Sequence, residues 1–575
     1  MKNQKREPVA LVMDEPVEEI PFSSYPRPQL KLNSYICLNG RWDDGVLVPF
    51  PLESALSGAA VSDGTITDGR DAQRGQSRHT YRRQFEIPAD FVQDKILLHF
   101  DAIDCIAKVF VDGQKAGEHT GGYLPFTCDI TASGAGHHEL VVETEDDTST
   151  DYPYGKQTLT PGGMWYTAIS GIWQSVWIES VPESYIEKIR LTPSLSDVKI
   201  EITGGSDTCL VRIYDRQDPK DGTCIYEQTH TQKTFTIPID NPRLWSPEEP
   251  NLYGLVIKSG ADEIVSYFGL RTVGVRSING KKRLCLNGKP YFFHGVLDQG
   301  YYPQGIFLPN NAGGYERDVQ RMKDLGFNTL RKHIKIEHPA FYEACDRLGM
   351  IVFQDMVNNG PYSFFKDTAL PTVFHGHVSD KRRHRDERTR AIFTEHAKET
   401  VAHLYNYPCI CYLTVFNEGW GQFDSDAMYD KMKAWDASRI IDSTSGWFKQ
   451  KKSDVESVHC YFKPIRPVKS ERPIVVSEMG GYSLRMEGHL FNRNDNYGYK
   501  TFENAKDLGD AIEKLYGCEV IPYIEAGLCG SIYTQLSDVE DETNGFYTYD
   551  RAVCKVDKQA MLRIAERIRS AMQKI

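Results

Sequence analysis

The strongest constraint on the fold is the alternation of strand and helix patterns through the second half of the chain. Eight short apolar, β-branched and aromatic segments have the length of buried strands: residues 292–296, 329–331, 351–353, 411–416, 440–443, 458–461, 473–477 and 531–536. Amphipathic helix patterns lie between several of them, and two of these helices end at Gly326 and Gly349. The pattern predicts one (β/α)8 TIM barrel for residues 276–575.

The first half of the chain has an all-β texture. Short alternating runs are separated by turn signals such as Asp112-Gly113, which is typical of a hairpin. Residues 1–183 are therefore predicted to form a jelly-roll β-sandwich. Residues 184–275 are about the size of an immunoglobulin-like β-sandwich and carry period-two alternation. The fold class expected is a multidomain α and β protein.

Composition excludes several classes of protein. A net charge of −12 argues against a nucleic-acid binder, which normally has a basic face. No stretch reaches the about 18–20 apolar residues of a membrane span, and no signal-peptide core follows the N-terminus. The 13 cysteines include no CxxC pair, which favours reduced thiols. We expect a cytoplasmic protein that binds neither nucleic acid nor membranes.

Two of the predicted strands lead directly into a carboxylate. Asn417-Glu418 follows the fourth strand and Glu478 follows the seventh. In a β/α barrel the C-terminal strand ends carry the catalytic groups. Two facing carboxylates there are what glycoside hydrolysis requires. The alternative interpretation is two unrelated surface glutamates.

Short motifs along nearly the whole chain resemble one enzyme family. They are LNGRW (38–42), FVDG (110–113), GGYLPF (121–126), GIWQSVW (171–177), FGLR (268–271) and LNGKP (286–290). In this order they resemble glycoside hydrolase family 2, the β-galactosidase and β-glucuronidase group, in its short three-domain form. The resemblance implies that Glu418 is the acid/base, that Glu478 is the nucleophile and that anomeric configuration is retained. The chemistry then needs carboxyl groups about 5–5.5 Å apart.

The resemblance also assigns supporting roles to residues near the two glutamates. Asn417 matches the asparagine that binds the sugar 2-hydroxyl, although a turn-capping role is the alternative. Tyr461 matches the tyrosine that holds the nucleophile, with a core tyrosine as the alternative. Arg331 is expected to support Glu478. The family histidine after this arginine would fall on Ile334, so His333 or Lys335 is expected to reach the ligand instead.

Other strand ends supply candidate sugar contacts. Asp298 and Gln299 follow the first strand and Asp355 ends the third, and their side chains offer the acceptors and donors that a polyol needs. Loop capping or ion pairing is the alternative for the two aspartates. Trp420 and Trp447 follow the fourth and fifth strands, and an exposed indole face suits the C–H face of a sugar.

The eighth strand and its loop bear on the identity of the sugar. The family tryptophan is replaced at about Thr534, so Tyr533 or Gln535 is expected to substitute. Glucuronidases of the family carry Asn-x-Lys after this strand, whereas residues 537–546 form an acidic loop that would repel a uronate. A neutral sugar, galactose first, is favoured. A β-hexuronidase that uses Lys335 or arginines of the 381–390 loop stays open, as does a non-catalytic carbohydrate-binding protein.

No cofactor is expected. His375, His377 and His384 lack the remaining ligands at a recognised metal spacing, although a structural Mg²⁺ or Na⁺ ion stays open. The expected partner is a carbohydrate substrate. Because members of the family are often dimers or tetramers, a homo-oligomer is expected.

Overall fold

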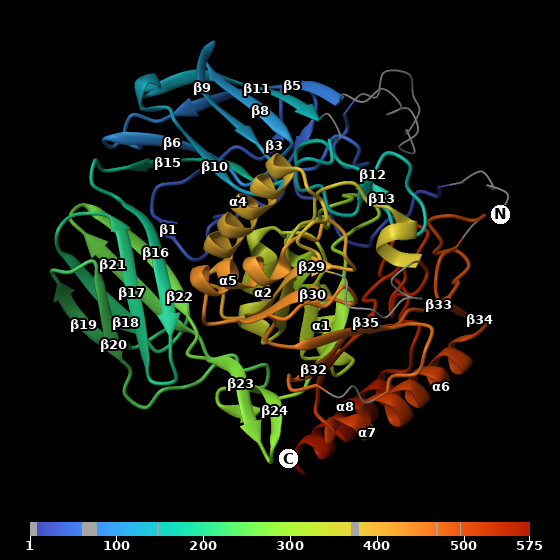
Figure 1. Cartoon of the computed structure of the whole chain (residues 1–575). Helices are drawn as coiled ribbons and strands as arrows, with labels where there is room; N and C mark the ends of the chain where they lie inside the picture. The colour runs from blue at the N-terminus through green and yellow to red at the C-terminus, as the bar shows by residue number, and fades with distance from the viewer. Residues whose placement is uncertain (1–7, 60–76, 147–148, 370–378, 467–469, 495) are drawn as a thin grey trace.

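The computed structural model describes the chain except for residues 1–7, 60–76, 147–148, 370–378, 467–469 and 495. Figure 1 shows a β-sandwich at the top, a second β-sandwich at the left and a barrel with helices in the remaining part. This architecture confirms the predicted fold class.

The barrel is built from one parallel sheet. Its eight strands follow the order β30-β29-β28-β27-β26-β35-β32-β31. They are β26 (Phe293–Asp298), β27 (Thr329–Lys332), β28 (Ile351–Asp355), β29 (Ile410–Asn417), β30 (Ile440–Ser445), β31 (Glu456–Cys460), β32 (Ile474–Gly480) and β35 (Leu528–Thr534). Each contains part or all of one predicted strand. Side chains bridge the two outermost strands, because Ser445 Oγ lies 3.3 Å from Ser457 Oγ and 2.9 Å from His459 Nε2.

Helices cover the outside of this sheet. The α-helices are α1 (Gly313–Asp324), α2 (Pro339–Leu348), α4 (Glu387–Leu404), α5 (Ser425–Trp435), α6 (Ala505–Leu515), α7 (Ile521–Ile524) and α8 (Lys558–Met572), and Phe364–Ala369 and Tyr516–Val520 form π-helical turns. Helix α2 shows why the sequence signals worked. Pro339 occupies its first turn, and it ends at Gly349 with a φ of +73°, which glycine adopts without steric cost.

The N-terminal sandwich packs two four-stranded sheets over an apolar core. One sheet has the order β10-β6-β15-β2 and the other β5-β11-β8-β9. Their bounds are β2 (Ile36–Cys37), β5 (Ser77–Ile87), β6 (Lys95–Phe100), β8 (Ile106–Val111), β9 (Gln114–Thr120), β10 (Phe126–Asp129), β11 (Gly136–Asp146) and β15 (Val176–Val181). A short parallel pair of strands, β12 (Gln157–Thr158) and β13 (Tyr166–Thr167), extends from this sandwich.

The second sandwich has the expected immunoglobulin-like form. It pairs a three-stranded sheet, β16-β17-β20, with a five-stranded sheet, β1-β22-β21-β18-β19. The strands are β1 (Lys31–Leu32), β16 (Ile186–Pro193), β17 (Asp197–Gly204), β18 (Cys209–Tyr214), β19 (Cys224–His230), β20 (Thr234–Pro238), β21 (Tyr253–Ser259) and β22 (Asp262–Phe268). Strand β1 comes from the N-terminal segment, so residues before the first sandwich complete the second one. Strands β23 (Val273–Ile278), β24 (Lys281–Leu286) and β25 (Lys289–Pro290) lead into the barrel.

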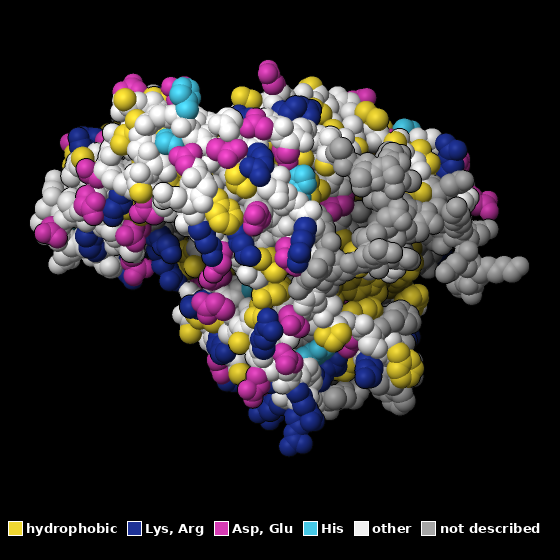
Figure 2. Space-filling view, turned by 90° about the horizontal axis from the view of Figure 1, so that it is seen from above, with side chains coloured by type: hydrophobic (Ala, Val, Ile, Leu, Met, Phe, Trp, Pro, Cys, Tyr) yellow, Lys and Arg dark blue, Asp and Glu magenta, His cyan; other side chains and the backbone are white. Residues whose placement is uncertain are grey.

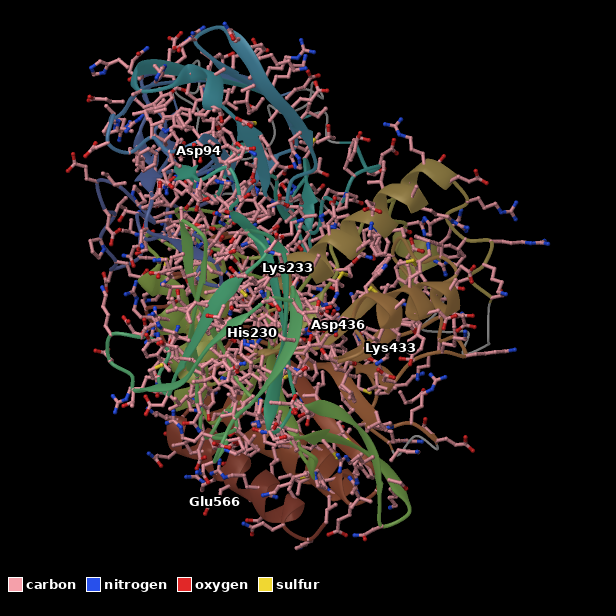
Figure 3. The ribbon with its side chains drawn as sticks, turned by 90° about the vertical axis from the view of Figure 1, so that its left-hand side faces the viewer. Asp94, His230, Lys233, Lys433, Asp436 and Glu566 are labelled. Atoms are coloured by element: carbon pink, nitrogen blue, oxygen red, sulfur yellow. The ribbon has the colours of Figure 1, made fainter. Side chains whose placement is uncertain are left out.

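Both sandwiches pack directly on the barrel. In the side view of Figure 3 the strands near His230 and Lys233 lie in front, with Lys433 and Asp436 from the end of α5 to their right. Arg190 Nη2 donates to the carbonyl oxygen of Trp435 at 2.8 Å, which joins the second sandwich to α5. The N-terminal sandwich contacts the barrel as well, since Tyr154 N–H donates to the carbonyl oxygen of Asn358 at 3.1 Å.

The surface and the cysteines match the composition. In Figure 2 acidic and basic side chains are interspersed over the described part of the upper face. The structure describes all 13 cysteines, none is joined in a disulfide, and most are buried. Among the described helices, none has both the length and the apolar character needed to cross a membrane.

Candidate active site

The candidate active site lies where β29 and β32 end. Both strands are buried along their whole length, so the sheet fixes their backbones. Glu418 follows Asn417 with a φ of +52°, a left-handed conformation that residues other than glycine seldom adopt. Its backbone N–H donates to the carbonyl oxygen of Ser445 at 2.9 Å, which holds the turn. Strained backbone of this kind clusters at functional sites.

Glu478 is an ionised carboxylate held by two donors. It is buried, Arg331 Nη1 lies 3.0 Å from its Oε1, and the Tyr461 hydroxyl donates to its Oε2 at 2.6 Å. Burial alone would raise the pKa of Glu478. The neighbouring His459 and Arg331 outweigh that effect and lower the pKa to about 2. Glu478 therefore carries a full negative charge at neutral pH.

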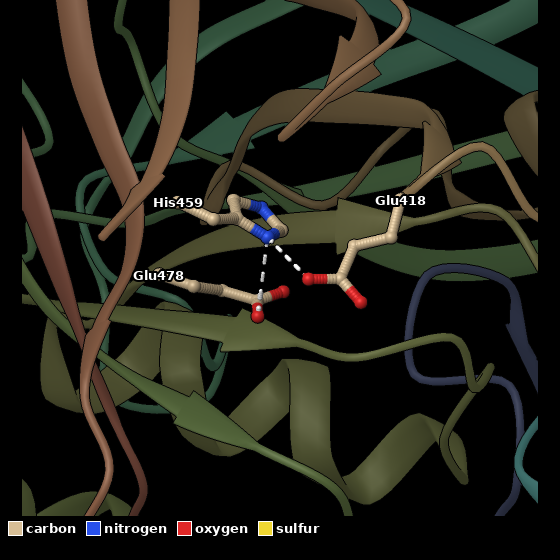
Figure 4. A group of neighbouring side chains, drawn as sticks. All are labelled: Glu418, His459 and Glu478. Atoms are coloured by element: carbon tan, nitrogen blue, oxygen red, sulfur yellow. Dashed lines mark hydrogen bonds and ion pairs between the residues drawn. The ribbon is translucent and has the colours of Figure 1, made fainter. Parts of the chain in front are cut away.

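His459 connects the two carboxylates, as Figure 4 shows. Its Nδ1 lies 2.8 Å from Glu418 Oε1 and 3.4 Å from Glu478 Oε2. This ring nitrogen and one oxygen of each carboxylate all lie within 4.8 Å of one another. The two carboxylates are thus close enough to act on the same bond.

The same three side chains are spaced closely enough to hold a metal ion. Arg331 already donates to Glu478, however, and its positive charge opposes a cation at this place. His375 and His377 lie outside the described residues. That no cofactor is needed stays a prediction, and a structural Mg²⁺ or Na⁺ ion stays open.

Arg331 organises the centre of the site. Its Nη2 donates to Asn417 Oδ1 at 2.9 Å and its Nε to Asp355 Oδ1 at 3.0 Å, in addition to the contact with Glu478. A guanidinium has donors in a fixed planar arrangement, so it orients all three partners at once. Because Asn417 Oδ1 accepts from Arg331, the amide nitrogen of Asn417 must point the other way.

Asp355 lies one contact away from the two glutamates. One of its oxygens accepts from Arg331, and the other lies 2.7 Å from His333 Nδ1. Burial would raise the pKa of Asp355, but Arg331 and His333 together lower it. The sequence predicted a sugar contact for Asp355, whereas in the structure it orients Arg331 and His333. His333 then has Nε2 as its remaining ring nitrogen for a ligand.

Asp298 and Lys335 lie in a different cluster, which corrects their predicted placement. Lys335 Nζ donates to Glu337 Oε1 at 2.8 Å and to two backbone carbonyl oxygens, so its three protons all have partners. Asp298 Oδ2 accepts from Lys332 Nζ at 2.6 Å. The reason is strand alternation: Asp298 pairs in register with Lys332, one residue past Arg331, and so points to the other face of the sheet.

The two predicted tryptophans differ in their surroundings. Trp420 is 2% exposed, and Trp165 from the N-terminal sandwich packs on it at 5.0 Å between ring centroids. Its face is therefore covered, contrary to the expectation of an exposed platform. Trp447 is half-buried and donates its Nε1 proton to the carbonyl oxygen of Glu418 at 3.0 Å. Trp447 thus borders the acid/base candidate.

Gln299 and Gln535 are both buried, and the Oε1 atom of each has no hydrogen-bond partner among the described residues. Gln535 Nε2 donates to Glu542 Oε2 at 2.6 Å and to Asn544 Oδ1 at 2.8 Å. The preceding residue, Thr534, lies 2.8 Å from the Tyr461 hydroxyl. The loop after β35 is therefore joined to the site.

Sequence reasoning missed three groups of this site. His459 lies two positions before Tyr461, and residues two apart on a strand share a face, so the alternation contained a usable signal. Glu542 is buried, although its acidic loop resembled a surface loop. Lys156 lies in a segment of the N-terminal sandwich that packs on the barrel, since the adjacent Gly155 N–H donates to the carbonyl oxygen of Asn358 at 3.3 Å, and no local pattern predicts this contact.

Three family models match consecutive parts of the chain. They are the sugar-binding domain of glycosyl hydrolases family 2 at residues 62–182, the family 2 model at 184–271 and the family 2 TIM barrel domain at 277–481. The chain is 25% identical to a β-galactosidase of Thermoanaerobacter pseudethanolicus over 57% of its length, and 27% identical to a β-glucuronidase of Chlorocebus aethiops over 63%. These alignments span only 43% and 58% of the two relatives.

Solved structures match over almost the whole chain. A β-D-glucuronidase of Dictyoglomus thermophilum has a TM-score of 0.72 and 20% identity, with 95% of this chain and 98% of that chain covered. A galacturonate-bound β-galacturonidase of Eisenbergiella tayi has a TM-score of 0.65 and 18% identity, with 94% and 98% covered. At these identities the likeness extends to the fold.

Proposed function

Because this chain belongs to glycoside hydrolase family 2, we propose that it is a retaining exo-β-glycosidase acting on terminal β-linked sugars, with β-galactosides as first candidate. The observation that carries this proposal is the pair Glu418 and Glu478, which lie at the C-terminal ends of β29 and β32 and bring one oxygen of each to within 4.8 Å of the other. Retaining enzymes use carboxyl groups about 5–5.5 Å apart, whereas inverting enzymes need about 6.5–9.5 Å to admit a water molecule.

In the first step Glu478 attacks the anomeric carbon. A glycosyl ester forms, the glycosidic C–O bond breaks, and Glu418 gives its proton to the leaving oxygen. The low pKa of Glu478, about 2, supports its role because a nucleophile must be ionised. Arg331 and Tyr461 each hold one of its oxygens, which fixes the direction of attack.

In the second step Glu418, now ionised, accepts a proton from water. The hydroxide equivalent attacks the anomeric carbon, the ester bond to Glu478 breaks, and the sugar leaves with its original configuration. His459 contacts both carboxylates, so it keeps them at a fixed separation through both steps. The amide nitrogen of Asn417 is oriented to donate to the sugar 2-hydroxyl.

The sugar has two candidate identities. Galactose is favoured by the acidic loop after β35 and by the β-galactosidases among the relatives. A hexuronide is the second candidate, because the matching solved structures include β-glucuronidases and a β-galacturonidase. Two of the cations first considered for a uronate already have acidic partners: Lys335 donates to Glu337, and Arg383 donates to Asp367 at 2.6 Å.

Initial hydrolysis rates on a panel of nitrophenyl glycosides test the proposal. The panel contains the β-galactoside, β-glucuronide, β-galacturonide, β-glucoside, β-mannoside and α-L-arabinopyranoside. We expect turnover of one member, its loss in Glu478→Gln, and its survival in Glu566→Gln, which alters an exposed glutamate of α8. Silence across the panel from folded protein would favour a non-catalytic carbohydrate-binding protein.

We also propose that the protein forms a homo-oligomer, as the family resemblance implies. Light scattering coupled to size-exclusion chromatography measures the mass directly. A mass equal to the 65.4 kDa chain at micromolar concentration would contradict this part of the proposal.

A further inference from the structure

A segment of the N-terminal sandwich closes over the C-terminal end of the barrel. The backbone N–H groups of Tyr154 and Gly155 both donate to the carbonyl oxygen of Asn358, just after β28. A Cβ atom on Gly155 would lie 2.9 Å from the carbonyl oxygen of Ile334, after β27, so only glycine allows this approach. Further along, Thr167 N–H donates to Glu540 Oε1 at 2.8 Å, in the loop after β35. The segment therefore spans the strand ends around the site.

Lys156 is the charged residue that this segment buries. It is 8% exposed, its carbonyl oxygen accepts from Tyr166 N–H at 3.0 Å, and its Nζ lies 5.5 Å from the ring centroid of Trp165. Within the part of the chain that the structure describes, its ammonium forms no hydrogen bond and no ion pair. A buried charge without a partner is unfavourable, so an oxygen atom of a ligand is its natural complement.

Glu542 lies in the loop after β35. It is 3% exposed, and burial raises its pKa to about 7, against the opposing charge of Lys156. Lys156 also acts electrostatically on His333, while Glu478 acts on both His333 and Glu542. The hydrogen bonds agree with this: Tyr166, whose N–H donates to the Lys156 carbonyl oxygen, precedes Thr167, which donates to Glu540 in the same tight loop as Glu542.

A short chain of contacts connects Glu542 to the reacting centre. Gln535 Nε2 donates to Glu542 Oε2 at 2.6 Å, and the adjacent Thr534 Oγ1 lies 2.8 Å from the Tyr461 hydroxyl. Tyr461 in turn holds Glu478 at 2.6 Å. A sugar bonded to Glu478 would therefore extend towards the loop that carries Glu542.

We propose that Lys156 and Glu542 together bind one hydroxyl group of the glycone. The lysine donates a hydrogen bond to the hydroxyl oxygen, and the glutamate accepts a hydrogen bond from the hydroxyl. The inference rests on the proposed glycosidase function and adds to it the class of sugar, which is neutral. The physical reason is that a hydroxyl both accepts and donates a hydrogen bond, as this pair requires. A uronate carboxylate can only accept hydrogen bonds, so it would bind Lys156 but would require Glu542 to be protonated.

The test compares two nitrophenyl substrates that differ only at C6, the β-D-galactoside and the β-D-galacturonide. Lys156→Met keeps most of the length of the side chain and removes its charge. Glu542→Gln replaces the carboxylate with an amide of the same shape. Lys108→Met, which alters an exposed lysine of the same sandwich, is the matched control. Circular dichroism and thermal melting confirm that each variant is folded, and Lys156→Gln is a second variant should the first not fold.

We expect Lys156→Met to lower kcat/KM for the galactoside by about 100-fold, because a lost hydrogen bond leaves its partner unpaired. Glu542→Gln should lower it by about 10-fold and raise the ratio of galacturonide to galactoside turnover. Among monodeoxy galactosides, the substrate that lacks the bound hydroxyl should have a low kcat/KM with the wild type. Lys156→Met should lower that kcat/KM little further, because the hydrogen bond that the variant removes is already absent.

Two results would overturn the inference while leaving the glycosidase function intact. One is a wild type that prefers the galacturonide and loses it in Lys156→Met, which would make Lys156 a carboxylate receptor. The other is unchanged kcat/KM in folded Lys156→Met and Glu542→Gln. Absence of wild-type turnover, with no covalent adduct from a 2-deoxy-2-fluoro glycoside by mass spectrometry, would instead overturn the proposed function and the inference with it.

Discussion

Two buried glutamates in this molecule have nearly the same set of partners. In the barrel, Glu478 contacts Arg331, Tyr461 and His459. In the N-terminal sandwich, Glu179 accepts hydrogen bonds from Arg27 and Tyr25 and lies 2.9 Å from His99 Nε2. Burial would raise the pKa of each glutamate, and in each the positive neighbours prevail and lower it to about 2.

The two clusters differ in what else they contain. The His99 ring stacks on Trp177 at 4.8 Å, and the side chain of Glu179 is 1% exposed. Its acidic neighbour Asp101 is also buried, and burial raises its pKa well above the usual range. Beside Glu478 stands Glu418, whose side chain is 14% exposed at a strand end.

The comparison teaches that an ionised carboxylate with an arginine, a tyrosine and a histidine is not by itself a catalytic site. Such a set equally holds a sandwich together. What distinguishes the barrel cluster is a second carboxylate that a substrate can reach, placed where parallel strands end.

The largest expected effect is on activity. Glu478→Gln removes the nucleophile, so kcat should fall by about 10⁵-fold, while the amide keeps the shape of the site. Measurement of kcat and of the urea unfolding midpoint separates the two effects. Retention of more than a hundredth of the activity would show that Glu478 is not the nucleophile.

Glu179→Gln should do the reverse. Removing one member of a buried ion pair leaves Arg27 without its counter-charge, so the free energy of unfolding should fall by about 3 kcal/mol with kcat unchanged. Since the folded pKa of Glu179 lies below its ordinary value, its contribution is present above about pH 4.5 and is lost as pH falls towards 2. The difference in stability between wild type and variant should shrink over that range, and a constant difference would contradict this account.

The barrel and both sandwiches could be predicted because their strands are uninterrupted apolar or alternating runs bounded by turn residues. Glu418 and Glu478 could be placed because strand ends in a barrel converge, whereas Arg331 and Tyr461 were placed by the resemblance to the family. His459 was within reach, since it shares a strand face with Tyr461.

The remaining misplacements depend on tertiary structure that no local pattern encodes. Asp298 is the last residue of β26, and Glu478 lies close to the end of β32. Asp298 pairs in register with Lys332, however, so its side chain lies on the face of the sheet opposite to Arg331. Trp420 is covered only because Trp165 of another domain packs on it. The segment of Lys156 packs on the barrel through the docking of two domains separated by a whole sandwich in sequence.

Tyr461→Phe should have a smaller effect than loss of the nucleophile. Without the hydroxyl, Glu478 loses a donor to its ionised form, so its pKa should rise and the acidic limb of the kcat/KM profile should move to higher pH. We expect kcat to fall by about 10²-fold. Tyr25→Phe, which removes the equivalent donor from Glu179, is the control and should leave the profile unmoved. An unshifted acidic limb in folded Tyr461→Phe would argue against this role.

The smallest expected effect belongs to His459→Gln. The glutamine amide can still form a hydrogen bond with Glu418. The substitution removes the imidazole ring, which bridges both carboxylates and contacts Ser445 on β30, the other outermost strand of the sheet. If His459 acts by positioning, kcat should fall by about 10-fold with KM little changed. The acidic limb of the kcat/KM pH profile should move to higher pH, because Glu478 loses a neighbour that lowers its pKa. His99→Gln beside Glu179 should alter stability and leave kcat unchanged. A loss of kcat as large as that of Glu478→Gln would instead mean that His459 itself transfers a proton. His459 would then be a catalytic residue beside the two carboxylates rather than a residue that positions them.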